Sequence, residues 1–209
     1  MTSVTPQTAD TATFEAEAVA RRKKNRILGL HHHAYLVRDM EETRHFYEDI
    51  LGMPLVGTWV ERTNPVTGQP DNYSHLFFEL ADGSALAFFQ FKSEQSNRDQ
   101  ALNAFADNNP FAHHIALHVD GEDVLKDYQE RLKTAGVASF ATDHGYCRSL
   151  YFHDPSGMQI ELTTNVPETV AMMGQAARDA HELLKNWMAE DDVPTNNTRR
   201  GDGWVKSDA

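Results

Sequence analysis

Three side chains of this sequence could share one divalent metal ion. His32 and His114 lie in apolar segments with the composition of strands, and Glu161 stands between Ile160 and Leu162 in a third such segment. Two neutral imidazoles and one carboxylate form the ligand set of open iron(II) sites, and manganese(II) accepts the same donors. These residue types therefore predict a metal site that keeps coordination positions free for a substrate.

A repeated pattern explains how such distant residues could meet. Each histidine opens a strand-like segment, 30–37 or 112–119, and an amphipathic helical segment follows each one, 40–50 or 122–135. Three strand candidates then complete each copy: 55–60, 75–80 and 85–91 in the first, and 138–142, 149–153 and 158–163 in the second. A duplicated unit of this kind predicts an α+β fold of two strand–helix–three-strand modules.

The repeat also divides the chain. We expect a polar N-terminal extension at 1–26 and a C-terminal helix with a polar tail at 166–209. Between them lie module one, a polar crossover and module two, at 27–92, 93–110 and 111–165. The core should therefore lie within 27–165.

Alternation along the strands places the candidate ligands. Successive side chains of a strand point to opposite faces, and the bulky apolar set should meet the helix. His32, His114 and Glu161 then all fall on the face away from the helix, so two sheets that curl into a cup would bring them together. Gln90 is expected on the matching face of 85–91, together with Phe88.

Composition excludes several classes of partner. The net charge is −12, from 19 basic and 31 acidic residues, which argues against nucleic acid and against an anionic membrane surface. The single cysteine, Cys147, excludes an intrachain disulfide and fits a reducing compartment. The sequence shows neither an apolar run of membrane-spanning length nor the layout of a signal peptide, so we expect a cytoplasmic protein.

The residues 28–165 resemble the vicinal oxygen chelate superfamily, which includes glyoxalase I, fosfomycin-resistance enzymes, epimerases and extradiol ring-cleaving dioxygenases. The resemblance rests on the two histidine strands and on the turn Asp154-Pro155-Ser156-Gly157 before Glu161. It implies paired βαβββ modules in a half-barrel around a divalent metal, with His32, His114 and Glu161 as ligands. Members of this superfamily usually dimerise, so a homodimer is expected.

One stretch carries a narrower resemblance. From Thr142 to Glu161 the chain is similar to the type I extradiol dioxygenase signature, which implies that His144 and Tyr151 line the pocket beside the metal. The leading hypothesis is then an Fe(II)-dependent enzyme, with Mn(II) as a second choice of metal, that cleaves a catechol-type diol with O2. The family's separate acid–base histidine has no match in the polar stretch 94–109, so His118 is a candidate substitute. Well-studied relatives also carry four modules, whereas this chain carries two.

Other interpretations stay open. Tyr151 could be an ordinary core residue and His144 a loop cap, while Trp59 and Phe88 could wall the pocket or pack in the core. A glyoxalase-like lyase, an isomerase or an epimerase could use the same scaffold, with Gln90 as a fourth ligand. A third alternative is a binding protein for a small aromatic compound, which would need no metal.

Overall fold

The computed structural model describes residues 8–25, 27–63, 68–92 and 113–189. The elements of the first half are α1 (Thr8–Lys24), β1 (His32–Leu36), α2 (Met40–Arg44), η1 (His45–Ile50), β2 (Leu55–Thr63), β3 (Pro70–Glu79) and β4 (Ala85–Phe91). Those of the second half are β5 (His114–His118), α4 (Glu122–Thr134), β6 (Ser139–Asp143), β7 (Cys147–His153), β8 (Gln159–Asn165) and α5 (Thr169–Met188). Every strand and helix expected within the two modules is present, with shifted ends.

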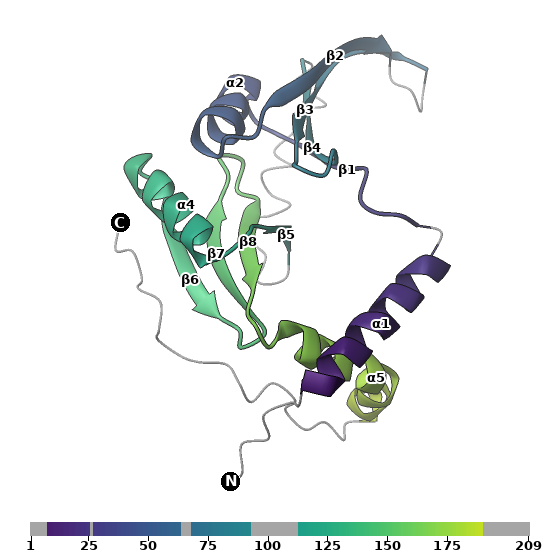
Figure 1. Ribbon diagram of the computed structural model, residues 1–209. Coiled ribbons are helices and arrows are strands. Elements are labelled where there is room, and N and C mark those ends of the chain that lie inside the picture. The colour runs from purple at the N-terminus through teal and green to yellow at the C-terminus, as the bar shows by residue number, and fades with distance from the viewer. Residues whose placement is uncertain (1–7, 26, 64–67, 93–112, 190–209) are drawn as a thin grey trace.

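Each module forms its own four-stranded sheet. The strand orders are β1-β4-β3-β2 and β5-β8-β7-β6, so the two modules repeat one topology (Figure 1). In each sheet the first strand pairs parallel with the last, and the remaining pairs are antiparallel. The predicted α+β fold of two βαβββ modules is therefore confirmed.

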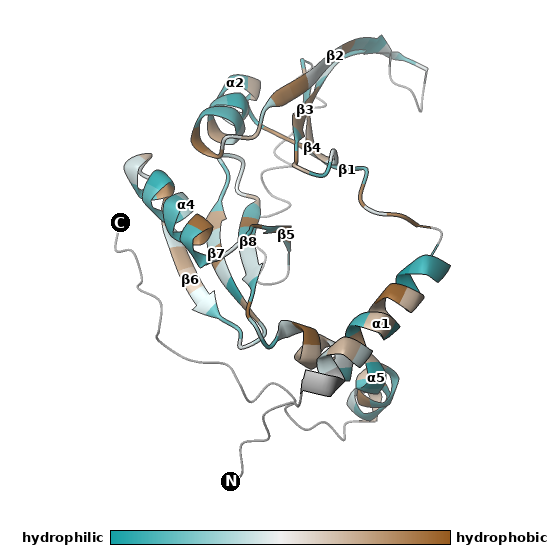
Figure 2. Ribbon diagram, viewed as in Figure 1, coloured by the Kyte–Doolittle hydropathy of each residue, from teal (hydrophilic) through white to brown (hydrophobic). Residues whose placement is uncertain are grey.

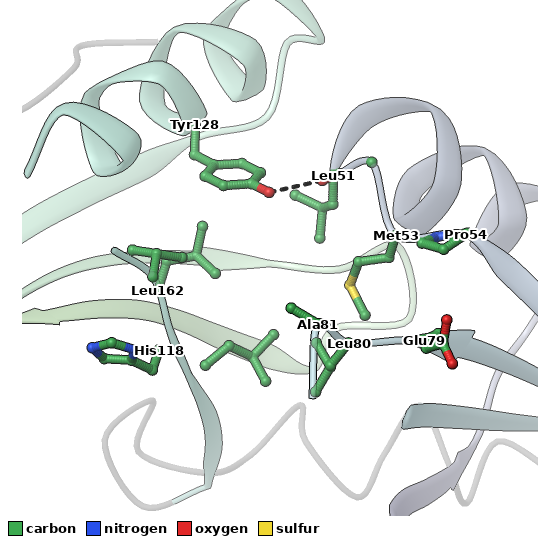
Figure 3. A pocket seen from close by; sticks show the side chains of 12 residues that line it. Leu51, Met53, Pro54, Glu79, Leu80, Ala81, His118, Tyr128 and Leu162 are labelled. Carbon is green, nitrogen blue, oxygen red and sulfur yellow. Dashed lines mark hydrogen bonds between the residues drawn. The ribbon is translucent and has the colours of Figure 1, made fainter. Parts of the chain in front are cut away.

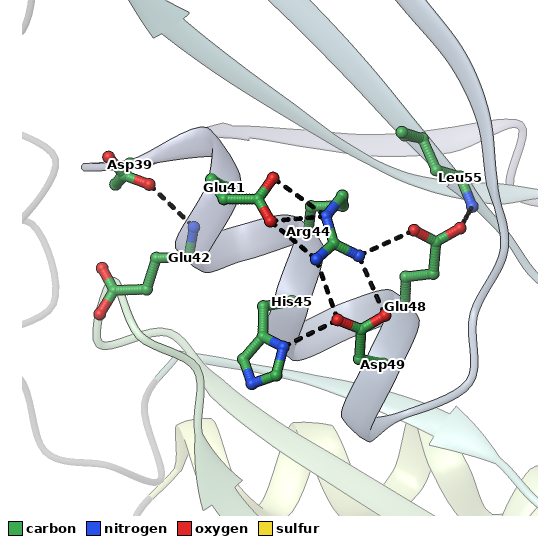
Figure 4. Close-up of polar contacts among 8 residues, drawn as sticks. All are labelled: Asp39, Glu41, Glu42, Arg44, His45, Glu48, Asp49 and Leu55. Atoms are coloured by element: carbon green, nitrogen blue, oxygen red, sulfur yellow. Dashed lines mark hydrogen bonds and ion pairs between the residues drawn. The ribbon is translucent and has the colours of Figure 1, made fainter.

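The first module's helix begins at a side-chain cap and continues into a wider turn. Asp39 accepts a hydrogen bond from the backbone N–H of Glu42 at 2.8 Å, as expected of an N-cap. After Arg44 the chain becomes the π-helical η1. The Arg44 guanidinium holds this junction, because it donates to the carboxylates of Glu41, Glu48 and Asp49 (Figure 4). The hydrogen bonds from Arg44 and then from His45 lower the pKa of Asp49 to about 2.

One hydrophobic core runs through both modules. The side of each sheet that meets its helix contributes to it, and the Phe46 ring of η1 lies 6.1 Å from the Phe152 ring of β7. Helix α4 is largely hydrophilic (Figure 2) and buries only Leu125 and Leu132. We call the side of each sheet that lies in this core its helix face, and the opposite side its open face.

Buried polar groups join the modules beside this core. Asp154, in the turn before β8, accepts hydrogen bonds at Oδ2 from the hydroxyls of Tyr35 and Tyr47, at 3.0 and 3.1 Å. Its Oδ1 accepts the backbone N–H groups of Ser156 and Met158. Burial raises the pKa of Asp154 and of both tyrosines. A carboxyl group of module two is thus buried against the first strand and helix of module one.

The terminal helices α1 and α5 lie side by side, away from the two sheets (Figure 1). Phe14 packs on Gly174, and Arg178 both stacks over the Phe14 ring and pairs with Glu17 at 2.7 Å. None of the helices that the structure describes is both long and apolar enough to cross a membrane.

Gly174→Ala should loosen α1. A Cβ built at Gly174 would overlap the Phe14 ring, so the helices must separate, at a cost of about 1–3 kcal/mol for overpacking. Limited proteolysis should then cut the segment between α1 and β1 faster than in the wild type. Ala176→Gly on the exposed side of α5 is the control, because it weakens the helix without touching Phe14. Equal cleavage in all three proteins would contradict the packing argument.

Candidate functional site

Two of the three predicted ligands lie against each other. Strands β5 and β8 pair in parallel with Ala116 opposite Glu161, which brings His114 and Glu161 onto one face. The Nε2 atom of His114 is 3.0 Å from Oε2 of Glu161, and their side chains are 30% and 8% exposed. Two ligand atoms about 2.1 Å from one ion, at a right angle, lie about 3 Å apart. The pair therefore fits two adjacent positions on a divalent cation.

Tyr151 and His144, which the sequence predicts beside a metal, lie next to the His114–Glu161 pair. We call these four residues the Glu161 cluster. Tyr151 stands directly opposite Glu161 in the β7–β8 register, and its ring centre is 6.1 Å from that of His114. Nε2 of His144 is 2.9 Å from the Tyr151 hydroxyl. Burial, and secondly the charge of Glu161, raise the pKa of Tyr151, so the phenol stays neutral and can donate a hydrogen bond.

Sequence reasoning missed a further member of the cluster. The Ser149 hydroxyl lies 2.5 Å from Oε1 of Glu161 and is completely buried. Its position could have been read from the β7–β8 register, because Ser149 and Tyr151 share one face of β7, next to Glu161. A serine alone carries no metal or acid–base signal, so the sequence offered no reason to select it.

His32 is not part of this group within one chain. Its side chain lies on the open face, as predicted, but its neighbours there are His31 and, at ring distances of 6.2 and 5.5 Å, His75 and Phe77. Across the described ranges no group of three or more His, Cys, Asp or Glu side chains is arranged to hold a metal ion. The expectation that one chain gathers His32 with His114 and Glu161 in a single cup is therefore not met. The physical reason is that the modules share a core through their helix faces.

Two of the predicted pocket residues, Phe88 and Gln90, lie on the helix face of the first sheet and not on its open face. In the β1–β4 register His32 stands opposite Ala85 and Tyr35 opposite Phe88, so Phe88 lies on the helix face. Phe88 is 0% exposed in the core, and Gln90, on the same face, donates to the backbone carbonyl of Arg38. The prediction that Gln90 and Phe88 line the cup, with Gln90 as a fourth ligand, is corrected accordingly.

The open face of the first sheet is instead an aromatic surface. Trp59, the third predicted pocket residue, stands opposite His75 in the β2–β3 register and is 62% exposed. His75 stacks on Phe89 with ring centres 3.6 Å apart. The surface, defined by register and ring contacts, consists of Trp59, Tyr73, His75, Phe77, Phe89 and Phe91. Every second residue of 73–77 belongs to it, and this alternation was the available signal.

His118 lies at the far end of β5 from His114. It borders a mainly apolar pocket of about 360 Å³ between the modules, together with Leu51, Met53 and Tyr128 (Figure 3). The Tyr128 hydroxyl donates there to the carbonyl of Leu51 across the module boundary. In the β5–β8 register His118 stands opposite Thr163, whose hydroxyl lies 3.1 Å from that of Ser149. The predicted catalytic role of His118 stays a prediction.

Positively charged side chains are scarce on the open faces of the described strands. The strand registers place no lysine or arginine on the open face of either sheet, as far as the strands are described. Arg148, between Ser149 and the buried Cys147, points to the helix face, where it pairs with Asp143. Such faces suit an uncharged substrate better than a phosphate or phosphonate, which needs cationic or amide donors.

Comparison with known proteins agrees with this fold. A family model described as the Glyoxalase/Bleomycin resistance protein/Dioxygenase superfamily matches residues 29–162. A curated protein from Actinomyces sp., 2-epi-5-epi-valiolone epimerase, is 26% identical over 67% of this chain and 80% of its own length.

Similar solved structures include a fosfomycin resistance protein, FosX, from Listeria monocytogenes. It is 23% identical, covers 69% of this chain and 98% of its own, and has a TM-score of 0.49. A mutant of that protein was solved with Mn(II) and 1S,2S-dihydroxypropylphosphonic acid, at 23% identity over 68% of this chain and 96% of its own, with a TM-score of 0.47.

These findings correct the predicted reaction. The curated relative is an epimerase, so the assignment as an extradiol ring-cleaving dioxygenase is wrong. The residues that suggested it, His144 and Tyr151, do lie at the site. They belong to a site architecture that several reactions share, and therefore could not identify one of them.

Proposed function

Because the chain belongs to the Glyoxalase/Bleomycin resistance protein/Dioxygenase superfamily, we propose that it is a metal-dependent epimerase for a small uncharged substrate. The observation that carries this proposal is the His114–Glu161 pair with its 3.0 Å separation, next to a neutral tyrosine and a histidine. The epimerase relative supports the choice of reaction, and the absence of cations at open-face strand positions, among the described strands, supports the choice of substrate.

The chemistry required is a proton transfer without net oxidation. Epimerisation next to a carbonyl breaks one C–H bond, with the proton taken by a base and the electron pair left on an enolate. The enolate carbon then takes a proton from solvent water on its opposite face. A divalent metal, when bound, polarises the carbonyl oxygen as a Lewis acid. The neutral Tyr151 hydroxyl is placed to donate a hydrogen bond to developing negative charge. His144 is the proposed base through Nδ1, because its Nε2–H can then donate to the Tyr151 oxygen and leave the phenol hydrogen for the substrate.

Epimerisation in D2O tests this function directly. The protein is loaded with Mn(II) and incubated with 2-epi-5-epi-valiolone, and product formation is followed by proton NMR. We expect inversion at one carbon, one deuterium incorporated there, and no consumption of O2. Metal-free protein is the control. Unchanged substrate in the presence of tightly bound Mn(II) would overturn the epimerase assignment while leaving the metal site standing.

We further propose that His32 of a second copy completes each metal site in a homodimer. His32 is exposed on the open face of its sheet, and one chain alone does not bring it to His114 and Glu161. In a dimer with a twofold axis, the open face of each first sheet could pack on the open face of the second sheet of the other copy. The axis repeats this contact, so the dimer would contain two such sites. Each site would then combine His32 from one copy with His114 and Glu161 from the other.

Mixed dimers distinguish this arrangement from a site within one chain. His32→Ala and Glu161→Gln should each be inactive alone. When they are co-expressed with different tags, a heterodimer should hold one intact site, so a statistical mixture should recover about one quarter of wild-type activity. A site within one chain predicts no recovery at all. Size-exclusion chromatography with light scattering checks that each variant still forms dimers.

A further inference from the structure

We infer that Ser149 is a positioning residue that fixes the carboxylate of Glu161 for metal binding. The inference deepens the metal site proposed above and rests on it. Ser149 would not touch the substrate or the metal. It would act by holding one oxygen of Glu161, so that the other oxygen faces His114 and the ion.

The two oxygens of Glu161 have separate partners. Oε1 lies 2.5 Å from the Ser149 hydroxyl, and Oε2 lies 3.0 Å from Nε2 of His114. Ser149 is 0% exposed and Glu161 is 6% exposed, so water cannot readily replace the serine as a donor. The Tyr151 hydroxyl is a further hydrogen-bonding neighbour of both Glu161 and Ser149. The Ser149 and His114 contacts together direct one oxygen of the carboxylate to the side where His114 lies.

The Ser149 hydroxyl has one short contact, to Glu161, and two longer ones, to Thr163 and Cys147. A serine hydroxyl has one hydrogen, and its shorter contact is the one to Glu161, at 2.5 Å against 3.1 Å to the Thr163 hydroxyl. Thr163 can then donate to the Ser149 oxygen or to the backbone carbonyl of Arg148, which is 3.2 Å away. The Cys147 thiol, 3.8 Å from the Ser149 oxygen, is a second weak partner. Donation toward Ser149 strengthens its own bond to the carboxylate.

This arrangement has a consequence for metal affinity. Partners that orient a metal ligand typically change affinity by about 10–100-fold when they are removed. Ser149→Ala leaves Glu161 in place but removes the donor at Oε1. The carboxylate can then rotate, and both of its oxygens compete for the His114 side of the site. We expect Mn(II) to bind about 10–100-fold more weakly.

Titration of Mn(II) into the metal-free dimer, followed by calorimetry and by the EPR signal of free Mn(II), measures this effect. Thr163→Val removes the hydroxyl behind Ser149 and should weaken binding only a few-fold. Ser84→Ala is the matched control, because Ser84 is a buried serine of module one that bonds Asp82. Its Mn(II) affinity should equal that of the wild type.

Thermal unfolding with and without Mn(II) separates positioning from a purely structural role. Positioning predicts a smaller metal-induced rise in Tm for Ser149→Ala, because stabilisation by a ligand depends on its Kd. A structural role predicts a lower Tm without metal and an unchanged Mn(II) Kd, which would overturn the inference. If Ser149→Ala fails to fold, an unchanged Kd in Thr163→Val overturns it. A wild-type protein that binds no Mn(II) would instead overturn the proposed metal site itself.

Discussion

Glu161→Gln is expected to abolish tight Mn(II) binding and turnover together. Glutamine keeps the shape of the side chain but removes its negative charge, and it turns one oxygen into an N–H donor that cannot bind a cation. In either orientation between the Ser149 hydroxyl and the His114 ring, the amide offers the ion at most one neutral oxygen in place of a charged carboxylate. The loss of affinity should exceed the roughly 100-fold that removal of an outer partner can cost.

Calorimetric titration of Mn(II) measures the loss, and circular dichroism checks that the variant is folded. Glu79→Gln is the matched control, since Glu79 is an exposed glutamate at the end of β3, where it borders the apolar pocket. Its Mn(II) affinity and turnover should stay at wild-type levels. An unchanged Mn(II) affinity in Glu161→Gln would show that the ion binds elsewhere.

Asp154→Ala is expected to give the largest loss of stability. The change leaves two buried backbone amides, those of Ser156 and Met158, and the hydroxyls of Tyr35 and Tyr47 without their common acceptor. A buried donor without a partner costs about 1–3 kcal/mol, so the total loss should reach at least about 3 kcal/mol. Urea unfolding at pH 7 measures it.

The turn before β4 provides the control. Asp82 accepts from the backbone N–H and the hydroxyl of Ser84, as Asp154 accepts from its own turn, but Asp82 is exposed. Asp82→Ala should therefore cost less than about 1 kcal/mol. Equal losses in the two variants would show that burial at the module boundary adds nothing.

The pH dependence of stability gives a second signature of Asp154. Because burial raises its folded-state pKa, the folded protein binds this proton more tightly than the unfolded chain. The extra stability from binding this proton is complete below the unfolded pKa of about 3.9 and is lost as the pH rises through the raised folded value; it adds to the hydrogen-bond contribution measured at pH 7. Asp154→Ala should lack this component, so its stability relative to the wild type should be lowest at acidic pH.

The sequence predicted the strands and helices of both modules and the shared face of His114 and Glu161. Strong alternation in 114–118 and the strand of Glu161 predicted the faces of both residues, and parallel pairing then placed them together. The strand 85–91 contains apolar residues on both faces, so alternation could not identify its open side, and Gln90 was misplaced. The ladder with β1 decides that question, and it is a long-range contact.

The distance between His32 and the other two predicted ligands depends on the packing of the two modules. Local patterns place it on an open face, but its distance from Glu161 depends on how the two modules pack. That packing arises from Phe46, Phe152 and Asp154, whose meeting no periodicity within a segment encodes. The reaction was misassigned for a related reason: His144 and Tyr151 are positioned by the scaffold, and the scaffold serves several chemistries.

The shared core also bears on how such a chain could arise. Half of this protein, taken alone, would expose the apolar side that Phe46 or Phe152 now occupies. A single-unit ancestor would therefore have needed another copy of itself to keep water from that side. Joining two units in tandem makes this encounter intramolecular, at an effective concentration set by the connecting segment. Gene fusion would thus have made permanent an association that previously depended on protein concentration.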